Sequence, residues 1–96
     1  MTVSLQQRFE SFADQYKKFE HIPAPRHPRP DVCAYLLLHE LVPGAQNMVS
    51  AAVHDEIYLS VDCGELHQAA TDAHIEELVR CGVRYIGDFD CLGMFV

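Results

Sequence analysis

The sequence predicts an α+β fold in which an N-terminal amphipathic helix and a proline-rich linker precede an α-β-β-α-β-β domain with a mostly antiparallel four-stranded sheet. Three observations lead to this prediction: an aromatic stripe at helical spacing, a cluster of prolines after it, and strict alternation of apolar and polar residues over 57–62. The 96 residues are 49% hydrophobic and 22% charged, the balance of an ordinary globular domain. Because no apolar run approaches the roughly 20 residues that cross a bilayer, and no secretory signal opens the chain, we expect a cytoplasmic protein.

The first predicted element is a helix over residues 4–20. Ser4 is a suitable N-cap, and Lys17 and Lys18 suit the negative end of the helix dipole. Aromatic residues recur every three or four positions, which places them on one face of an α-helix. This aromatic stripe consists of Phe9, Phe12, Tyr16 and Phe19. Such a face has to be buried, either on the core of this chain or on a second chain.

Residues 21–30 hold four of the five prolines and therefore predict an extended polyproline II linker. At about 3.1 Å per residue the linker spans about 30 Å, more than the radius of about 12 Å expected for a domain of this size. The chain is thus expected to divide into a helical arm with its linker, residues 1–30, and a small acidic α+β domain, residues 31–96. The linker is long enough for the arm to reach a neighbouring subunit.

The second part begins with a predicted helix, capped by Asp31 and stopped after Val42 by Pro43. Two β-rich runs, 48–53 and 57–62, then surround a polar break and predict a hairpin.

A further helix is expected from a cap at Thr71 or Asp72 to Cys81, with Gly82 just after its end. Strands over 83–86 and 91–96, joined by a turn, complete the predicted sheet.

Charge is unevenly distributed along the chain. Residues 1–30 carry a net charge of +2, whereas residues 31–96 carry −9. A body this acidic repels phosphate backbones and attracts basic proteins, so we expect no direct contact with nucleic acid and a basic or nucleic-acid-binding protein as partner. The acidic side chains that we expect to contact such a partner are Asp55, Glu56, Asp62, Glu65, Asp72, Glu76 and Glu77.

No cofactor or catalytic signature is present. His39 and Glu40 begin like a zinc-binding HExxH motif, but Pro43 occupies the position of the second histidine. The four cysteines include no CxxC pair and are read as free thiols, with a zinc cluster of Cys63, His67 and Cys81 as the alternative. We therefore expect no cofactor and no enzymatic activity.

Carboxylates at two turns offer a rival function, a small metal-dependent hydrolase or nuclease. Asp55 and Glu56 lie in the first turn, and Asp88 and Asp90 in the second. If strands two and three are parallel, the two turns fall at opposite ends of the sheet. Bringing them together requires antiparallel strands and an additional short helix over 65–70.

The run Val53-His54-Asp55-Glu56 resembles the VHDE hairpin in the palm of family-A DNA polymerases, where the acidic turn holds catalytic metal. The resemblance covers residues 52–61 and supports a hairpin there. The other metal-binding aspartate motif and the basic fingers helix of that family have no counterpart, so no catalytic residue is carried over.

Residues 49–57 and 78–85 resemble patterns in small accessory proteins of phages and mobile elements. The resemblance implies stoichiometric binding to host machinery, including defence complexes. We therefore expect a non-enzymatic protein–protein interaction module, an inhibitor of a host nucleic-acid-handling or defence complex, that touches neither nucleic acid nor membrane.

The small size of the second part also predicts a homodimer. About 65 residues bury a marginal core, and the aromatic stripe would add several hundred Å² of apolar contact at roughly 25 cal/mol per Å². We expect helix 4–20 to contribute to a two-fold interface, with docking on its own chain as the alternative.

Overall fold

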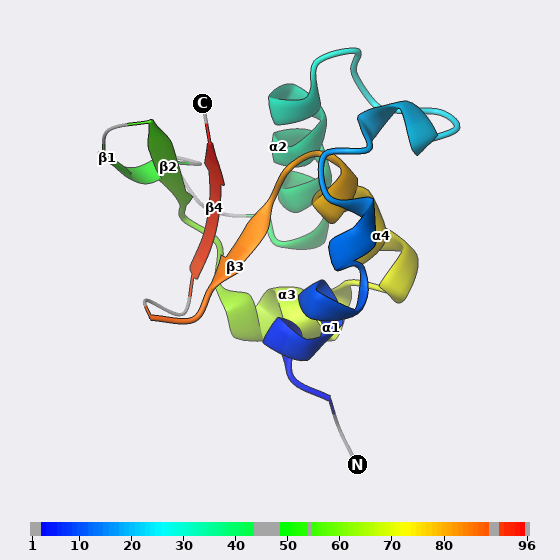
Figure 1. Ribbon diagram of the computed structural model, residues 1–96. Coiled ribbons are helices and arrows are strands. Elements are labelled where there is room, and N and C mark those ends of the chain that lie inside the picture. Colours follow the sequence, from blue (N-terminus) through cyan, green and yellow to red (C-terminus); the bar gives the residue numbers. More distant parts are fainter. Residues whose placement is uncertain (1–2, 44–48, 54, 89–90, 96) are drawn as a thin grey trace.

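The computed structural model describes residues 3–43, 49–53, 55–88 and 91–95, and it confirms the α+β fold (Figure 1). The helices and strands of these residues are α1 (Leu5–Ser11), the 3-10 helices η1 (Ala13–Gln15) and η2 (Phe19–His21), α2 (Pro30–Leu41), β1 (Val49–Val53), β2 (Glu56–Leu59), α3 (Cys63–Ala69), α4 (Asp72–Arg80), β3 (Arg84–Ile86) and β4 (Cys91–Phe95). No helix in this part of the chain is long and apolar enough to cross a membrane.

The four strands form one antiparallel sheet in the order β1-β2-β4-β3. The predicted hairpin is confirmed, with Ala52 opposite Ile57 and one irregularity in register between Val49 and Ala51. Because β2 and β3 both pair antiparallel with β4, they run parallel to each other. The two hairpin turns therefore lie at opposite ends of the sheet.

The core lies between the sheet and the helices, which gather on one side of it (Figure 1). Alternation along β2 and β4 points Leu59, Leu92 and Met94 toward the helices. The fully buried side chains include Cys33, Leu37, Leu38, Leu66, Ile75, Leu78, Val83 and Leu92. Burial of this apolar surface holds the helices against the sheet.

Helix α2 confirms the predicted helix but begins differently. Arg29 is its N-cap, Pro30 is its first residue, and Asp31 lies in the first turn instead of capping it. Proline suits the first helical position because its φ is already helical and no N–H is required there.

The N-terminal helix is shorter than the predicted helix over residues 4–20. Ser4 caps it as expected, but α1 ends at Ser11, and the chain continues through η1 and η2. A straight 17-residue helix would extend about 25 Å along one line. The turns instead let the chain follow α4, against which α1, η1 and η2 all pack.

The proline-rich segment is not an extended arm. Residues 23, 24 and 26–29 bend, Ile22 is buried in the core, and Arg26 forms ion pairs with Glu40 of α2 and Glu77 of α4. These contacts fasten the segment to the helices, so it does not run free as the predicted linker. Residues 3–30 thus share one core with the rest of the described chain.

Helix α3 is an element that the predicted α-β-β-α-β-β order lacks. Asp62 caps it by accepting a hydrogen bond from the Glu65 N–H at 2.9 Å. Helix α4 follows with a capping box of Thr71 and His74, and Gly82 (φ 96°) ends it in the left-handed conformation expected of this position. Two helices therefore connect the parallel strands β2 and β3.

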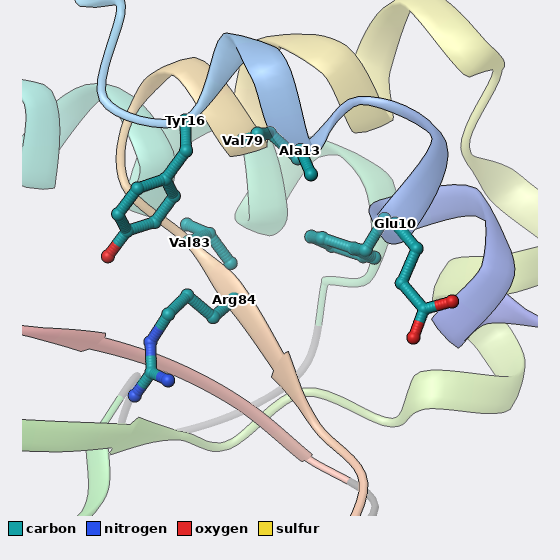
Figure 2. Close-up of a pocket in the computed structure, with 7 residues that line it drawn as sticks. Glu10, Ala13, Tyr16, Val79, Val83 and Arg84 are labelled. Carbon is teal, nitrogen blue, oxygen red and sulfur yellow. The ribbon is translucent and has the colours of Figure 1, made fainter.

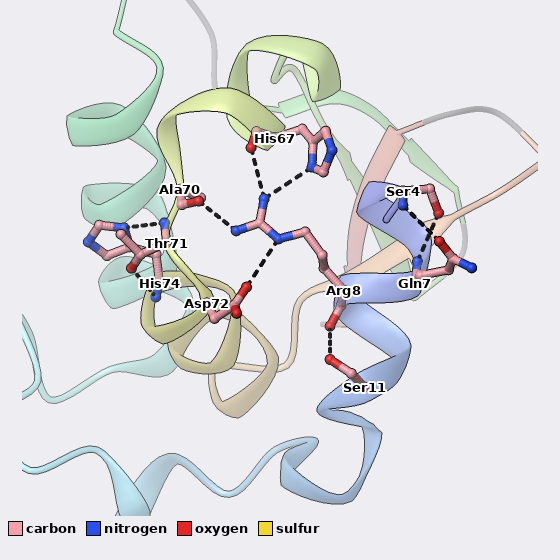
Figure 3. A network of polar contacts seen from close by, with 9 residues as sticks. All are labelled: Ser4, Gln7, Arg8, Ser11, His67, Ala70, Thr71, Asp72 and His74. Carbon is pink, nitrogen blue, oxygen red and sulfur yellow. Dashed lines mark hydrogen bonds and ion pairs between the residues drawn. The ribbon is translucent and has the colours of Figure 1, made fainter. Parts of the chain in front are cut away.

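Arg8 joins α1 to the corner between α3 and α4 (Figure 3). Its guanidinium donates to the carbonyl oxygens of His67 at 2.8 Å and Ala70 at 2.6 Å, and to the Asp72 carboxylate at 3.3 Å. These carbonyls belong to the end of α3, where no further helical turn supplies donors. The Arg8 side chain is only 10% exposed, so its charge depends on these partners.

Replacement of Arg8 by methionine is expected to lower the free energy of unfolding by about 3 kcal/mol, because buried carbonyls lose a charged donor. The matched control is Arg29→Met, because the Arg29 side chain is 70% exposed in its ion pair with Asp31 and should cost less than about 0.5 kcal/mol. Urea unfolding of both variants measures the difference. Equal losses would show that Arg8 does not hold the corner.

Cys81, at the end of α4, is buried beside Cys33 of α2. Burial raises the pKa of the Cys81 thiol above its ordinary value of 9.0, and the neighbouring Cys33 thiol raises it further. Both thiols act as small apolar groups in the helix interface.

This shift predicts that the protein loses stability in alkali. Above about pH 9 the unfolded chain releases the Cys81 proton while the folded chain retains it, so the free energy of unfolding falls by up to about 1.4 kcal/mol per pH unit. Cys81→Ala should flatten this fall between about pH 8 and 10.5 in chemical denaturation, compared with the unaltered protein. An unchanged slope in Cys81→Ala would contradict the assignment.

Candidate interaction surface

Strand β1 forms one edge of the sheet, and its main contacts in the described chain are with β2. Its sequence, Val-Ser-Ala-Ala-Val, contains no charged residue and no proline, and Val49, Ala51 and Ala52 are exposed. Edge strands are usually blunted by charge, proline, shortness or a covering helix, because their backbone groups can pair with another strand. Within residues 3–43, 49–53, 55–88 and 91–95, only the irregularity beside Val49 protects β1, and it leaves 51–53 in regular register.

The opposite edge, β3, is protected. It has only three residues, it carries Arg84, and α1 packs against it with Phe9 and Tyr85 6.5 Å apart between ring centroids. In the part of the chain that the structure describes, the sheet therefore offers one edge for pairing.

The two acidic residues at the turn beside β1, Asp55 and Glu56, have different surroundings. Asp55 is exposed at the turn, whereas Glu56 pairs with Arg84 of β3 across the intervening strand β4. Gly93 lies beneath this pair, and a Cβ there would come within 2.5 Å of an Ile86 methyl group. His54 lies outside the described residues.

The other predicted acidic contacts do not form a single face. Asp72, Glu76 and Glu77 pair with Arg8, Arg80 and Arg26 of this chain. Asp62 and Glu65 are exposed at the start of α3, which follows the C-terminal end of β2. Asp55 lies at the other end of that strand.

The carboxylates of the rival metal site are separated by the parallel arrangement of β2 and β3. The turn with Asp55 adjoins Phe95, whereas Asp88 follows the pair of Ile86 and Cys91. Four residue steps along β4, from Cys91 to Phe95, separate these ends by about 13 Å, whereas metal ligands lie within about 2.6 Å of one ion. Asp90 lies outside the described residues, within which no three His, Cys, Asp or Glu side chains gather as metal ligands, the zinc alternative of Cys63, His67 and Cys81 included.

The aromatic stripe packs on the core of its own chain. Phe9 is 6% exposed, and Phe12, Tyr16 and Phe19 are half-buried against the core. The stripe is therefore docked on its own chain, which was the alternative to a dimer interface. A homodimer stays a prediction, but a stripe already packed in this way is not available as its main interface.

Three features were not singled out by the sequence analysis: the open edge at β1, the Arg84–Glu56 pair, and the left-handed backbone of Lys17 (φ 62°). The absence of charge over 49–53 was a readable signal for the first. The other two depend on how distant segments pack.

Comparison with protein-family models, characterised proteins and solved structures finds no match to this chain. The resemblance to accessory proteins of phages and mobile elements therefore stays a prediction.

The separation of the turns predicts that millimolar Mg²⁺ or Mn²⁺ shifts the melting temperature by less than about 1 °C, because no site joins both carboxylate pairs. Differential scanning fluorimetry with and without metal measures this. A rise of several degrees in the melting temperature would contradict this prediction and support a metal site, if Asp55→Asn abolishes the rise and Asp14→Asn does not.

Proposed function

We propose that this chain is a non-enzymatic protein–protein interaction module whose partner adds a strand to β1. The observation that carries the proposal is the uncharged edge strand Val49–Val53, in which Val49, Ala51 and Ala52 are exposed. The small side chains of Ala51 and Ala52 allow another backbone to approach, and β-strand addition is a recurrent mode of protein recognition.

The energetics of strand addition favour a basic partner. Five residues offer about four or five backbone hydrogen bonds of about 1 kcal/mol each, which alone gives about millimolar affinity. Charge attraction can supply further affinity, since the chain has a net charge of −7 and the exposed Asp55 adjoins the edge. A basic, nucleic-acid-binding protein has the complementary charge, and the accessory-protein resemblance suggests that binding inhibits a host nucleic-acid-handling or defence complex.

The predicted effect of blocking the edge tests the proposal. Ala52→Lys places a charge on β1 and should weaken partner binding at least about tenfold, whereas Ala69→Lys, an equally exposed alanine on α3, should bind like the unaltered protein. The partner is first captured from a host lysate with the intact chain, and affinities are then measured with the purified partner at rising salt.

Equal affinities of the two lysine variants would overturn strand addition, and insensitivity to salt would overturn the basic partner. Sedimentation of the same proteins at tens of micromolar tests a second copy as the partner. A dimer that Ala52→Lys alone dissociates would show that the edge pairs with itself.

A further inference from the structure

A pocket of about 350 Å³ lies between the N-terminal segment, the end of α4 and the start of β3 (Figure 2). Its lining residues are Phe9, Glu10, Ala13, Tyr16, Val79, Val83 and Arg84. Five of these residues are apolar or aromatic, and the volume falls in the range of small-molecule sites. At about 30 Å³ per water-sized group, the pocket has room for about a dozen non-hydrogen atoms.

The apolar part of the pocket is formed where the N-terminal segment passes α4. Ala13 of η1 is exposed and presents only a methyl group to the pocket, so it leaves space there. Phe9 and Tyr16, which precede and follow Ala13 in the chain, supply aromatic walls. Val79 and Val83 line the pocket from the buried core. An apolar group that enters this space gains contacts with these side chains and leaves water.

Glu10 carries the one charge of this lining that has no ionic partner within the described residues. The other charged residue, Arg84, pairs with Glu56, and its Nε is buried, as is the Tyr16 hydroxyl, so neither atom meets a ligand. Glu10 is exposed, and its Oε1 accepts a hydrogen bond from the Gln6 side-chain amide at 3.2 Å. A carboxylate can accept several hydrogen bonds, so Glu10 can accept further donors from a ligand.

Positive charge of the protein lies on the other side of the pocket. Figure 2 shows the Arg84 guanidinium and the Tyr16 hydroxyl on one side and the Glu10 carboxylate on the other. Lys17, whose Nζ lies 5.7 Å from the centre of the Tyr16 ring, adds a second cation near that ring. A cationic group on a ligand is therefore attracted to the Glu10 side, in a protein whose net charge of −7 also favours cations.

We propose that this pocket binds a small organic amine, with its apolar body in the pocket and its ammonium group beside the Glu10 carboxylate. The body contacts Phe9, Val79 and Val83, and this apolar contact supplies most of the affinity. The ammonium group stays partly in water because Glu10 is exposed. The ion pair therefore adds little to the affinity but selects a cation over a neutral or anionic group.

Three ligands with the same phenylbutyl body test this preference: 4-phenylbutylamine, 4-phenylbutan-1-ol and 4-phenylbutyrate. Each has about a dozen non-hydrogen atoms and so matches the pocket in size. At neutral pH we expect the amine to bind about three- to fivefold more tightly than the alcohol, which is the range of an exposed ion pair, and the acid to bind most weakly. Chemical-shift titration of the intact, isotope-labelled protein measures each affinity and should show shifts at the amides of Ala13, Val79 and Val83.

Glu10→Gln removes the charge and nearly preserves the shape of the side chain. It should abolish the preference for the amine over the alcohol and leave the affinity for the alcohol unchanged. The matched control is Glu20→Gln, at an exposed glutamate in η2 outside the pocket. This control changes the net charge by the same amount and should keep the preference.

A second variant fills the pocket without disturbing the core. Ala13 is exposed, so Ala13→Leu should fold normally and weaken the binding of all three ligands more than about tenfold. Ala73→Leu, at an exposed alanine of α4 outside the pocket, should have no effect.

Four results would each overturn the proposal. They are failure of the amine to bind at millimolar concentration, affinity for the alcohol or the acid equal to that for the amine, equal loss of the preference in Glu10→Gln and Glu20→Gln, and unchanged affinity in an Ala13→Leu protein that melts like the unaltered chain. Strand β1 takes part in none of these measurements, so their outcome is separate from that of the interaction module.

Discussion

The buried guanidinium of Arg8 is the interaction on which the rest of the structure depends. It supplies donors to the last carbonyls of α3 and a charge partner to the first residue of α4, and so fixes the corner between two helices that the connection from β2 to β3 requires. It also anchors α1, whose position beside β3 covers one edge of the sheet. Without a charged group at this corner, the β3 edge of the sheet would lose the helix that covers it.

Most of the fold could be predicted because its signals are local. Alternation over 57–62 predicted β2, apolar periodicity predicted α4, and Gly82 predicted its end. The extent of α1 could not be predicted, because the same aromatic spacing suits one long helix or a short helix followed by turns that wrap a neighbour. Helix α3 was considered only as an alternative, since a seven-residue helix carries little periodicity and depends on the Asp62 cap and on Arg8.

The surface was less predictable than the core, because the sequence does not distinguish a carboxylate that faces solvent from one that pairs with an arginine. Glu56, Glu76 and Glu77 read as solvent-facing acids, but each pairs with an arginine from another turn or another segment. Pairing of Glu56 with Arg84 across β4 depends on the register of three strands, which no local pattern in the sequence reveals. The aromatic stripe was correctly identified as a surface that must be buried, but the length of the linker said nothing about which surface would cover it.

The unequal edges of the sheet also bear on how far association can proceed. Sheets that are open on both sides can pair repeatedly and grow into fibres. In this chain β3 is short, charged and flanked by α1, so a strand added at β1 uses the edge that the described residues leave uncovered. Pairing at this edge, with another protein or with a second copy, ends after a single step. The asymmetry lets a small, uncharged edge strand remain exposed without making the protein a seed for its own polymerisation.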